Sequence, residues 1–229
     1  MSFRNEREWI EMYKGKDALW FHDGNKLRPH ALLTSGKHSS GFFNSRIIIA
    51  DEKLLKEAAA DLIANFLDTF SLAEELDNLH VSCIVGPQTG ATRLAELLSI
   101  EILPFIENDC LWASPRKDDT LGKKSMIFSD AELGFMKGQS VLLCEDVVTT
   151  GGSIDLTVEA ITKAGGTVLP FVLALVNRSG ESEVSGKKII ALINRRMPMW
   201  EPVDCPLCKH DSKAVRPKEN WAKLTAEYN

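Results

Sequence analysis

Two neighbouring carboxylates and a turn rich in glycine and hydroxyl groups stand together in the second half of the chain. Glu145 and Asp146 follow an apolar run, Val141–Cys144, and the turn comes shortly after them. Glycines let a backbone fold closely around an anion, and hydroxyl groups add hydrogen-bond donors. Because the acids would repel a bare phosphate, they favour a ligand that also carries hydroxyl groups or a divalent cation. A phosphorylated sugar bound with Mg²⁺ meets both requirements. The turn consists of Thr149, Thr150, Gly151, Gly152 and Ser153.

The segments on either side should place this turn at the start of a helix. Val141–Cys144 is typical of a strand buried on both faces in a parallel sheet. After the turn, Ile154, Val158 and Ile161 recur at helical spacing. The first turn of a helix presents unpaired N–H groups and the positive end of the helix dipole, which favour an anion. The alternative is an ordinary strand–turn–helix corner with a solvated acidic pair. The chain contains neither GxxxxGK[ST] nor GxGxxG, so it lacks the motifs of two other phosphate-binding loops.

A second unit of the same kind occurs earlier in the chain. The apolar run Val81–Val85 leads through a glycine-containing loop into Arg93–Ile100, which has helical character. Repeated strand–loop–helix units require a parallel sheet with crossover helices. The sequence therefore predicts an α/β fold with a central, mostly parallel sheet flanked by helices. Further strands are predicted at Ile47–Ile49, Val168–Val176 and Ile189–Ile193, and a long helix at 52–70 with Asp51 as its N-cap. The loop consists of Gly86, Pro87, Gln88, Thr89 and Gly90.

Composition limits the classes of protein to be considered. A hydrophobic content of 44% and a charged content of 26% over 229 residues are ordinary for a globular protein with a substantial core. The net charge of −5 argues against a general nucleic-acid binder. The first residues are charged, without the apolar stretch of a secretory signal, and no run approaches the length of a membrane span. We expect a cytoplasmic protein that binds neither nucleic acid nor membrane.

The segment from Glu145 to Ser153, EDVVTTGGS, resembles the phosphoribosyl pyrophosphate signature of type I phosphoribosyltransferases. The resemblance implies that a base displaces pyrophosphate from C1 of the ribose. It assigns the 5′-phosphate to Thr149–Ser153 and the ribose hydroxyls to Asp146 with Glu145, directly or beside Mg²⁺. The Gly86–Gly90 loop, which resembles the family's pyrophosphate-binding loop, would hold the pyrophosphate with Mg²⁺.

A charged stretch at 115–125 resembles the mobile catalytic loop of the same family. Arg116 and Lys117 match the start of that loop and would close over the pyrophosphate. Thr120 and Gly122 stand where orotate enzymes usually have a further Lys and a His-Gly, so Lys123 or Lys124 would have to supply the missing positive charge. The alternative is a solvated hairpin tip.

The N-terminal string LTSGKHSSGFFN, residues 33–44, resembles the segment that covers the base in orotate phosphoribosyltransferases. It implies that Ser35 and Lys37 face the base from a small hood, although Thr34 stands where many members have Lys. Arg178 matches an arginine that contacts the base, while Asn177 replaces an acid of that motif. His38 is interpreted as a turn residue. The resemblance also implies a homodimer, because such loops often reach the neighbouring subunit's site.

Three functions remain open at this stage. The first is an orotate-type phosphoribosyltransferase, favoured by the hood segment and Arg178. The second is an enzyme of the same fold that acts on another base in salvage, favoured by the altered loop and by Thr34. The third is a regulator that senses phosphoribosyl pyrophosphate without catalysis.

The last 34 residues are unlike the rest of the chain. Cys205 and Cys208 form a CxxC pair, which is half of a zinc site, and His210 is a candidate third ligand. Cys110, Asp204 and Asp211 are candidates for the fourth, and an inert or reducible thiol pair is the alternative. Five cysteines are few and odd in number, so no disulfide framework is expected.

We divide the chain into a hood at 1–50, a core at 51–195 and an extension at 196–229.

Overall fold

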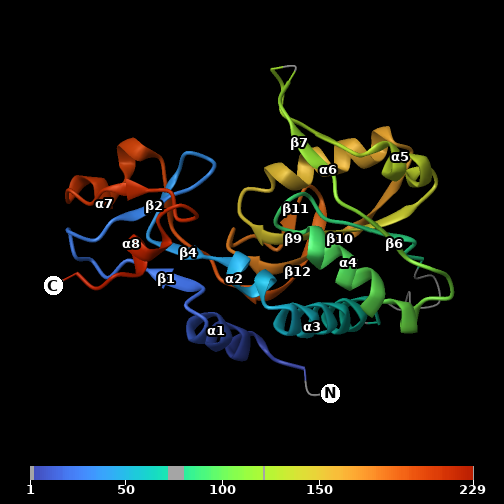
Figure 1. The fold of residues 1–229 in the computed structure, drawn as a ribbon, viewed down its shortest axis with the longest axis horizontal. Helices are drawn as coiled ribbons and strands as arrows, with labels where there is room; N and C mark the ends of the chain where they lie inside the picture. The colour runs from blue at the N-terminus through green and yellow to red at the C-terminus, as the bar shows by residue number, and fades with distance from the viewer. Residues whose placement is uncertain (1–2, 72–79, 121, 229) are drawn as a thin grey trace.

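The computed structural model describes residues 3–71, 80–120 and 122–228. A six-stranded sheet lies at its centre in the order β11–β12–β10–β9–β5–β6 (Figure 1). All neighbouring strands in it run parallel except β11, which pairs antiparallel with β12. The expected mostly parallel sheet is thereby confirmed. The strands are β5 (Cys83–Val85), β6 (Leu111–Ala113), β9 (Ser140–Val148), β10 (Thr167–Asn177), β11 (Glu183–Val184) and β12 (Lys187–Asn194).

Helices cover both faces of this sheet, as Figure 1 shows. One face packs against α1 (Glu6–Gly15), α3 (Glu52–Ser71) and α4 (Thr92–Glu101), and the other against α5 (Asp130–Met136) and α6 (Gly152–Lys163). Alternate strand residues face opposite sides: Leu142 belongs to the first apolar cluster and Leu143 to the second. This alternation explains why the central strands read as continuous apolar runs in the sequence. The predicted helix at 52–70 is confirmed, and Asp51 caps it by accepting from the Leu54 N–H at 3.1 Å.

Both ends of the chain build the hood. Its four-stranded sheet has the order β13–β3–β2–β14, and a separate pair joins β1 to β4. The blue and red segments that lie together in Figure 1 are these two ends. The hood has a small apolar core of its own, in which Leu224 from the end of the chain packs with Trp20, Ala31 and Leu33. The elements are β1 (Leu19–Phe21), β2 (His30–Leu32), β3 (His38–Ser39), β4 (Gly41–Phe43), β13 (Met199–Trp200), β14 (Ala214–Val215), α7 (Pro206–Lys209) and α8 (Trp221–Thr225), with a 3₁₀ turn at Pro202–Asp204.

The strand expected at Ile47–Ile49 is wrong. These residues lie in the short helix α2 (Ser45–Ala50), which buries Ile48 completely in the main core. A hydrogen bond of 3.0 Å between the Ser45 and Tyr13 hydroxyls ties its first turn to α1. Three apolar residues are too few for periodicity to distinguish a strand from one turn of helix, and burial of the central residue decides the outcome here.

A two-stranded arm projects from the body of the protein (Figure 1). It pairs β7 (Arg116–Asp118) antiparallel with β8 (Ser125–Ile127). A 3₁₀ turn at Leu103–Phe105 completes the elements of the described chain. Within the described residues, no helix is long and apolar enough to cross a membrane.

Candidate active site

A cavity of about 490 Å³ lies between the hood and the carboxyl ends of β5 and β9. Carboxyl ends of parallel strands meet at one edge of a sheet, which is where open α/β folds bind ligands. Most of the residues that the sequence singled out line this cavity. They are Ser35, Pro87, Gln88, Thr89, Gly90, Arg116, Lys117, Glu145, Asp146, Thr149, Ser153 and Arg178.

The acidic pair lies inside strand β9, which continues to Val148 beyond the apolar run. Glu145 is buried, and its burial, together with the neighbouring Asp146 carboxylate, raises the pKa of Glu145 well above its usual range. The Lys117 ammonium opposes this shift in the pKa of Glu145. Because burial beside Asp146 disfavours charge on Glu145, a cation or a hydroxyl-bearing ligand at this pair would stabilise its ionised form.

The loop after β5 packs directly against this pair. A Cβ atom added at Gly90 would lie 2.5 Å from Asp146 Oδ2, so the backbone approaches the carboxylate as closely as only glycine allows. Gly86 lies beneath the cavity rather than on its wall, and a Cβ there would be 2.6 Å from the Ala91 carbonyl oxygen. The Gln88 N–H donates to the Pro115 carbonyl at 2.9 Å, which joins this loop to the root of the arm. The Gln88–Thr89 peptide bond is cis.

The glycine-rich turn begins helix α6 as the sequence predicts. Gly151 is the N-cap with φ of +82°, a left-handed conformation that favours glycine, and a side chain there would collide with Val184. Thr149 and Ser153 line the cavity, whereas Thr150, Gly151 and Gly152 form the turn behind them. The turn thus joins the cavity-lining Thr149 to a twelve-residue helix, whose first N–H groups have no partner within the helix.

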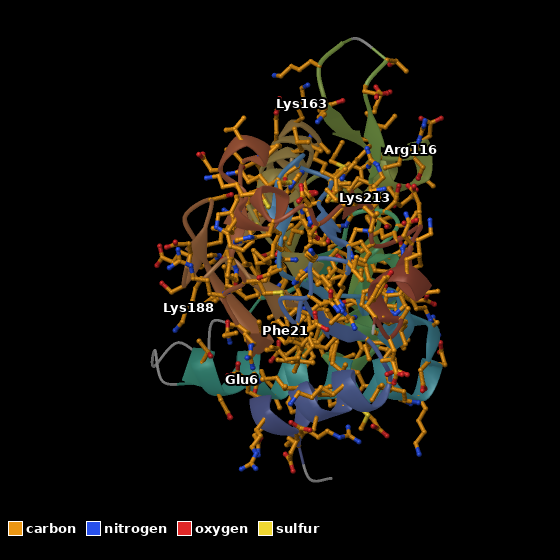
Figure 2. The ribbon with its side chains drawn as sticks, turned by 90° about the vertical axis from the view of Figure 1, so that its left-hand side faces the viewer. Glu6, Phe21, Arg116, Lys163, Lys188 and Lys213 are labelled. Atoms are coloured by element: carbon orange, nitrogen blue, oxygen red, sulfur yellow. The ribbon has the colours of Figure 1, made fainter. Side chains whose placement is uncertain are left out.

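The root of the arm supplies two cations to the cavity, and the arm's tip does not. Arg116, labelled at the root in Figure 2, lines the cavity with Lys117. Among the described residues, neither forms a salt bridge. Lys123 is 82% exposed, and its Nζ lies 4.0 Å from Glu159 Oε1 on α6. The structure therefore leaves Lys123 outside the cavity of its own chain.

Arg178 lines the same cavity as the acidic pair. Its side chain is buried, and one of its terminal NH₂ groups donates to Ser39 Oγ at 2.7 Å. Its Nε has no hydrogen-bond partner within the described part of the chain, and neither has the buried Oδ1 of Asn44. Burial lowers the pKa of Arg178 to about 10, so the guanidinium stays charged at neutral pH. An unpartnered buried donor carries a desolvation cost, which the free protein bears at Arg178.

Some expected residues lie elsewhere, and some lining residues were missed. Lys37 Nζ pairs with Glu201 Oε1 at 3.1 Å and does not line the cavity. Arg46 and Lys218 do line it. Arg46 follows the hood string by two positions, so proximity to a motif was an available signal. Lys218 belongs to the final segment, and no local pattern marked it.

The two cysteines of the CxxC pair have histidine neighbours, but not the expected one. His30, His38, Cys205 and Cys208 form a group whose potential ligand atoms all lie within 4.8 Å of one another. His210 is exposed and is outside this group, as are Cys110, Asp204 and Asp211. His38 is a buried residue of β3 rather than a turn residue. His30 lies in no motif that the sequence offered.

Comparisons with known proteins agree with this site. The model of the phosphoribosyl transferase domain family matches residues 48–205. The chain is 30% identical to an orotate phosphoribosyltransferase of Acidithiobacillus ferrooxidans, over 87% of this chain and 93% of that one. It is 28% identical to the protein of the same name from Caldicellulosiruptor bescii, over 93% and 97%. These similarities show a pentosyltransferase enzyme.

Solved structures show the same fold. The orotate phosphoribosyltransferase of Aeropyrum pernix aligns with a TM-score of 0.51 at 23% identity, over 80% of this chain and 91% of that one. A phosphoribosyltransferase of Corynebacterium diphtheriae aligns with a TM-score of 0.53 at 20% identity, over 82% and 94%.

Proposed function

The chain belongs to the phosphoribosyl transferase family, and we propose that it transfers ribose 5-phosphate from phosphoribosyl pyrophosphate to orotate. The observation that carries this proposal is the buried Arg178, which lines the cavity that also holds the acidic pair and the phosphate turn and has no salt-bridge partner among the described residues. Orotate is an anionic base, with a carboxylate and carbonyl oxygens that accept hydrogen bonds. A buried cation without an acidic partner favours it over uracil or a purine, which carry no carboxylate.

The reaction needs stabilisation of opposite charges at its two ends. As the bond from C1 to pyrophosphate breaks, positive charge develops on the sugar and negative charge on the leaving group. Arg116 and Lys117 would stabilise the leaving pyrophosphate, and Asp146 with Glu145 would bind the ribose hydroxyls. Thr149 and Ser153, with the N–H groups of the turn, would hold the 5′-phosphate. Closure of the arm would exclude water that otherwise hydrolyses the donor.

Mg²⁺ fits this set of residues. Its preferred ligands are oxygens, and Glu145 and Asp146 offer carboxylate oxygens beside the Pro87–Gly90 loop. When bound with the donor, Mg²⁺ would neutralise part of the pyrophosphate charge. The acidic pair would hold it directly or through the ribose hydroxyls.

A homodimer completes the proposed site. Lys123 lies away from its own cavity on an arm that projects from the body (Figure 1). An exposed apolar surface lies along α4, the following turn and the edge strand β6, where another copy could bury it. We infer that a second copy covers this surface and that each arm delivers Lys123 to the neighbouring cavity. The surface consists of Ile100, Leu103, Phe105, Leu111 and Trp112.

The proposal is tested by donor binding and turnover measured together. Calorimetry with phosphoribosyl pyrophosphate and Mg²⁺ should show binding to the full chain, and the loss of orotate should match the pyrophosphate released. Asp146→Asn should weaken donor binding and turnover sharply while the melting temperature stays near that of the parent. Donor binding without turnover on any base would replace the proposal with the sensor function. Normal activity of Asp146→Asn would refute the role of the acidic pair.

The subunit arrangement has its own test. Lys123→Ala and Asp146→Asn should each be poorly active alone, and mixing them after subunit exchange should restore about a quarter of the parent activity, because some hybrid sites then combine two intact residues. If the protein sediments as a monomer at assay concentration and is fully active, the proposal that two subunits form each active site is contradicted.

A further inference from the structure

Four metal-binding side chains from opposite ends of the chain converge in the hood. His30 comes from β2, His38 from β3, and Cys205 and Cys208 flank the start of α7. His30, His38 and Cys205 are buried, and Cys208 is half-buried. Imidazole nitrogens and thiolates are ligands that zinc prefers, and these four residues bring one such atom each into a single cluster.

The distances within the group are those of ligands on one tetrahedral ion. Cys208 Sγ lies 3.5 Å from His30 Nε2 and 3.2 Å from His38 Nδ1, and Cys205 Sγ lies 3.6 Å from His30 Nε2. The two ring nitrogens are 3.0 Å apart. Tetrahedral Zn²⁺ with its usual bond lengths would separate S from N by about 3.5 Å and N from N by about 3.3 Å. These four distances are within a few tenths of an ångström of the tetrahedral values, and all four ligand atoms lie within 4.8 Å of one another.

We propose that His30, His38, Cys205 and Cys208 bind one Zn²⁺ ion that fastens the C-terminal segment to the β2–β3 pair of the hood. Two thiolates and two imidazoles are a common ligand set for structural zinc. All four positions are filled by protein, which leaves no open position for a substrate or an activated water. The site is thus structural, and it is separate from the proposed Mg²⁺ site at Glu145 and Asp146.

A further hydrogen-bond chain fixes the orientation of His30. Ser212 Oγ donates to the Arg28 carbonyl at 2.6 Å, so it is free to accept from His30 Nδ1, which lies 2.9 Å away. That bond leaves the lone pair of Nε2 facing the two thiols and His38. Supporting contacts of this kind set the ring orientation and tautomer of zinc-bound histidines.

The hood has a physical need for such a fastening. Its strands are two or three residues long, and among the described residues its own apolar cluster has four buried members, with a few half-buried side chains packed against them. Units with so little apolar burial generally depend on a metal or a disulfide. Zinc binding supplies folding free energy directly, because the four ligands are together only in the folded state.

The ion would also steady the wall of the active site. Ser39 follows His38 in β3, accepts from Arg178, and donates to the Pro198 carbonyl at 2.7 Å. Lys218, from the segment that Cys205 and Cys208 fasten, lines the cavity. Losing the ion should therefore disturb the base side of the cavity more than the donor side. This consequence rests on the proposed function, whereas the zinc site itself does not.

Metal content is the primary test, and it requires no activity. The full chain, purified without a histidine tag and passed through gel filtration, should carry one zinc per chain by mass spectrometry of the metal. The cobalt-substituted protein should show the charge-transfer absorption of cobalt–thiolate bonds. His210→Ala and Cys110→Ser are matched controls and should keep one zinc per chain. The parent chain holding no zinc after incubation with excess metal would overturn the proposal, as would loss of zinc in His210→Ala.

Variants of the four proposed ligands and of Ser212 distinguish residues that bind zinc from residues that only contact the ligands. Cys208→Ser and His30→Ala should lose stoichiometric zinc and the cobalt–thiolate absorption. Ser212→Ala keeps all four ligands and should lower zinc affinity by about 10- to 100-fold. If a ligand variant does not fold, Ser212→Ala and chelator titration of the parent still decide the matter. Two results would refute the site. One is a disulfide between Cys205 and Cys208 in protein purified under reductant. The other is a normal zinc content in Cys208→Ser together with an unchanged zinc affinity in Ser212→Ala.

The effect on catalysis is a separate measurement. Removing zinc from the active parent should raise KM for orotate several-fold and leave the calorimetric Kd of phosphoribosyl pyrophosphate nearly unchanged. If the chain were inactive on every base, the zinc content and the melting temperature with and without chelator would still report on the site. Equal losses on both substrates would show that the ion supports the whole fold rather than the hood.

Discussion

Replacement of Arg178 by methionine should separate base recognition from stability. Methionine fills a similar volume without charge, so Arg178→Met removes the guanidinium of a cavity-lining residue while keeping apolar packing. A hydrogen bond to a charged group contributes about 1.5–3 kcal/mol, which corresponds to roughly 10- to 150-fold in kcat/KM. We expect a loss of that size in kcat/KM for orotate, with Kd for phosphoribosyl pyrophosphate unchanged by calorimetry.

The same substitution should not lower the melting temperature. Arg178 carries a buried charge with no acidic partner in the described chain and an Nε without a hydrogen bond. The folded protein without ligand therefore carries the free-energy cost of desolvating this charge. Replacing such a charge with an apolar side chain is often neutral or stabilising. Arg7→Met, at an exposed position of α1, is the control for the change of residue type. Unchanged kcat/KM for orotate, or an equal loss of donor affinity, would refute this reasoning.

Three further changes test the acidic pair, the arm and the packing of the first helix. Gly90→Ala should impair donor binding strongly, since the added Cβ would lie 2.5 Å from Asp146 Oδ2; the check is calorimetry. Lys117→Ala should lower kcat more than donor affinity, because its charge would act on pyrophosphate as it leaves, and steady-state kinetics should show that split. Asp61→Ala should lower the free energy of unfolding by about 1–3 kcal/mol in urea titrations, because the buried Trp9 Nε1–H loses its acceptor at 2.8 Å.

Matched variants make these results specific. Gly134→Ala, in α5, adds a Cβ with nothing within 4 Å and should bind donor normally. Lys53→Ala removes an exposed charge at the start of α3, outside the cavity, and should leave kcat close to that of the parent. If Gly134→Ala weakened donor binding as much as Gly90→Ala, contact with Asp146 would not be the cause.

The central sheet and the phosphate turn were predictable because their signals are local. Continuous apolar runs at β9 and β10 have few other interpretations, and a glycine in the left-handed region at Gly151 suits the start of α6. The strand predicted at Ile47–Ile49 was wrong because one helical turn and a short strand have the same apolar pattern over three residues. Glu145 and Asp146 were found, although β9 extends beyond them to Val148.

An N-terminal hood was expected, but the part of it built by the C-terminal segment could not be predicted, because its contacts join distant parts of the chain. β2 pairs with β14 across most of the sequence, and no local pattern encodes such a partner. The same reason explains why the sequence did not identify the two histidines of the proposed zinc site. His210 lies close to Cys208 in sequence but is exposed, whereas His30 and His38 reach the thiols only through the pairing of the two ends. Lys218 reaches the cavity in the same way.

The measurement that tests the central claim most directly is pyrophosphate release by the full chain with phosphoribosyl pyrophosphate and Mg²⁺, with bases supplied one at a time. The account expects release with orotate that depends on Arg178, and little release with uracil, adenine, guanine or hypoxanthine. Release with a purine and not with orotate would contradict the assignment of the buried guanidinium to an anionic base.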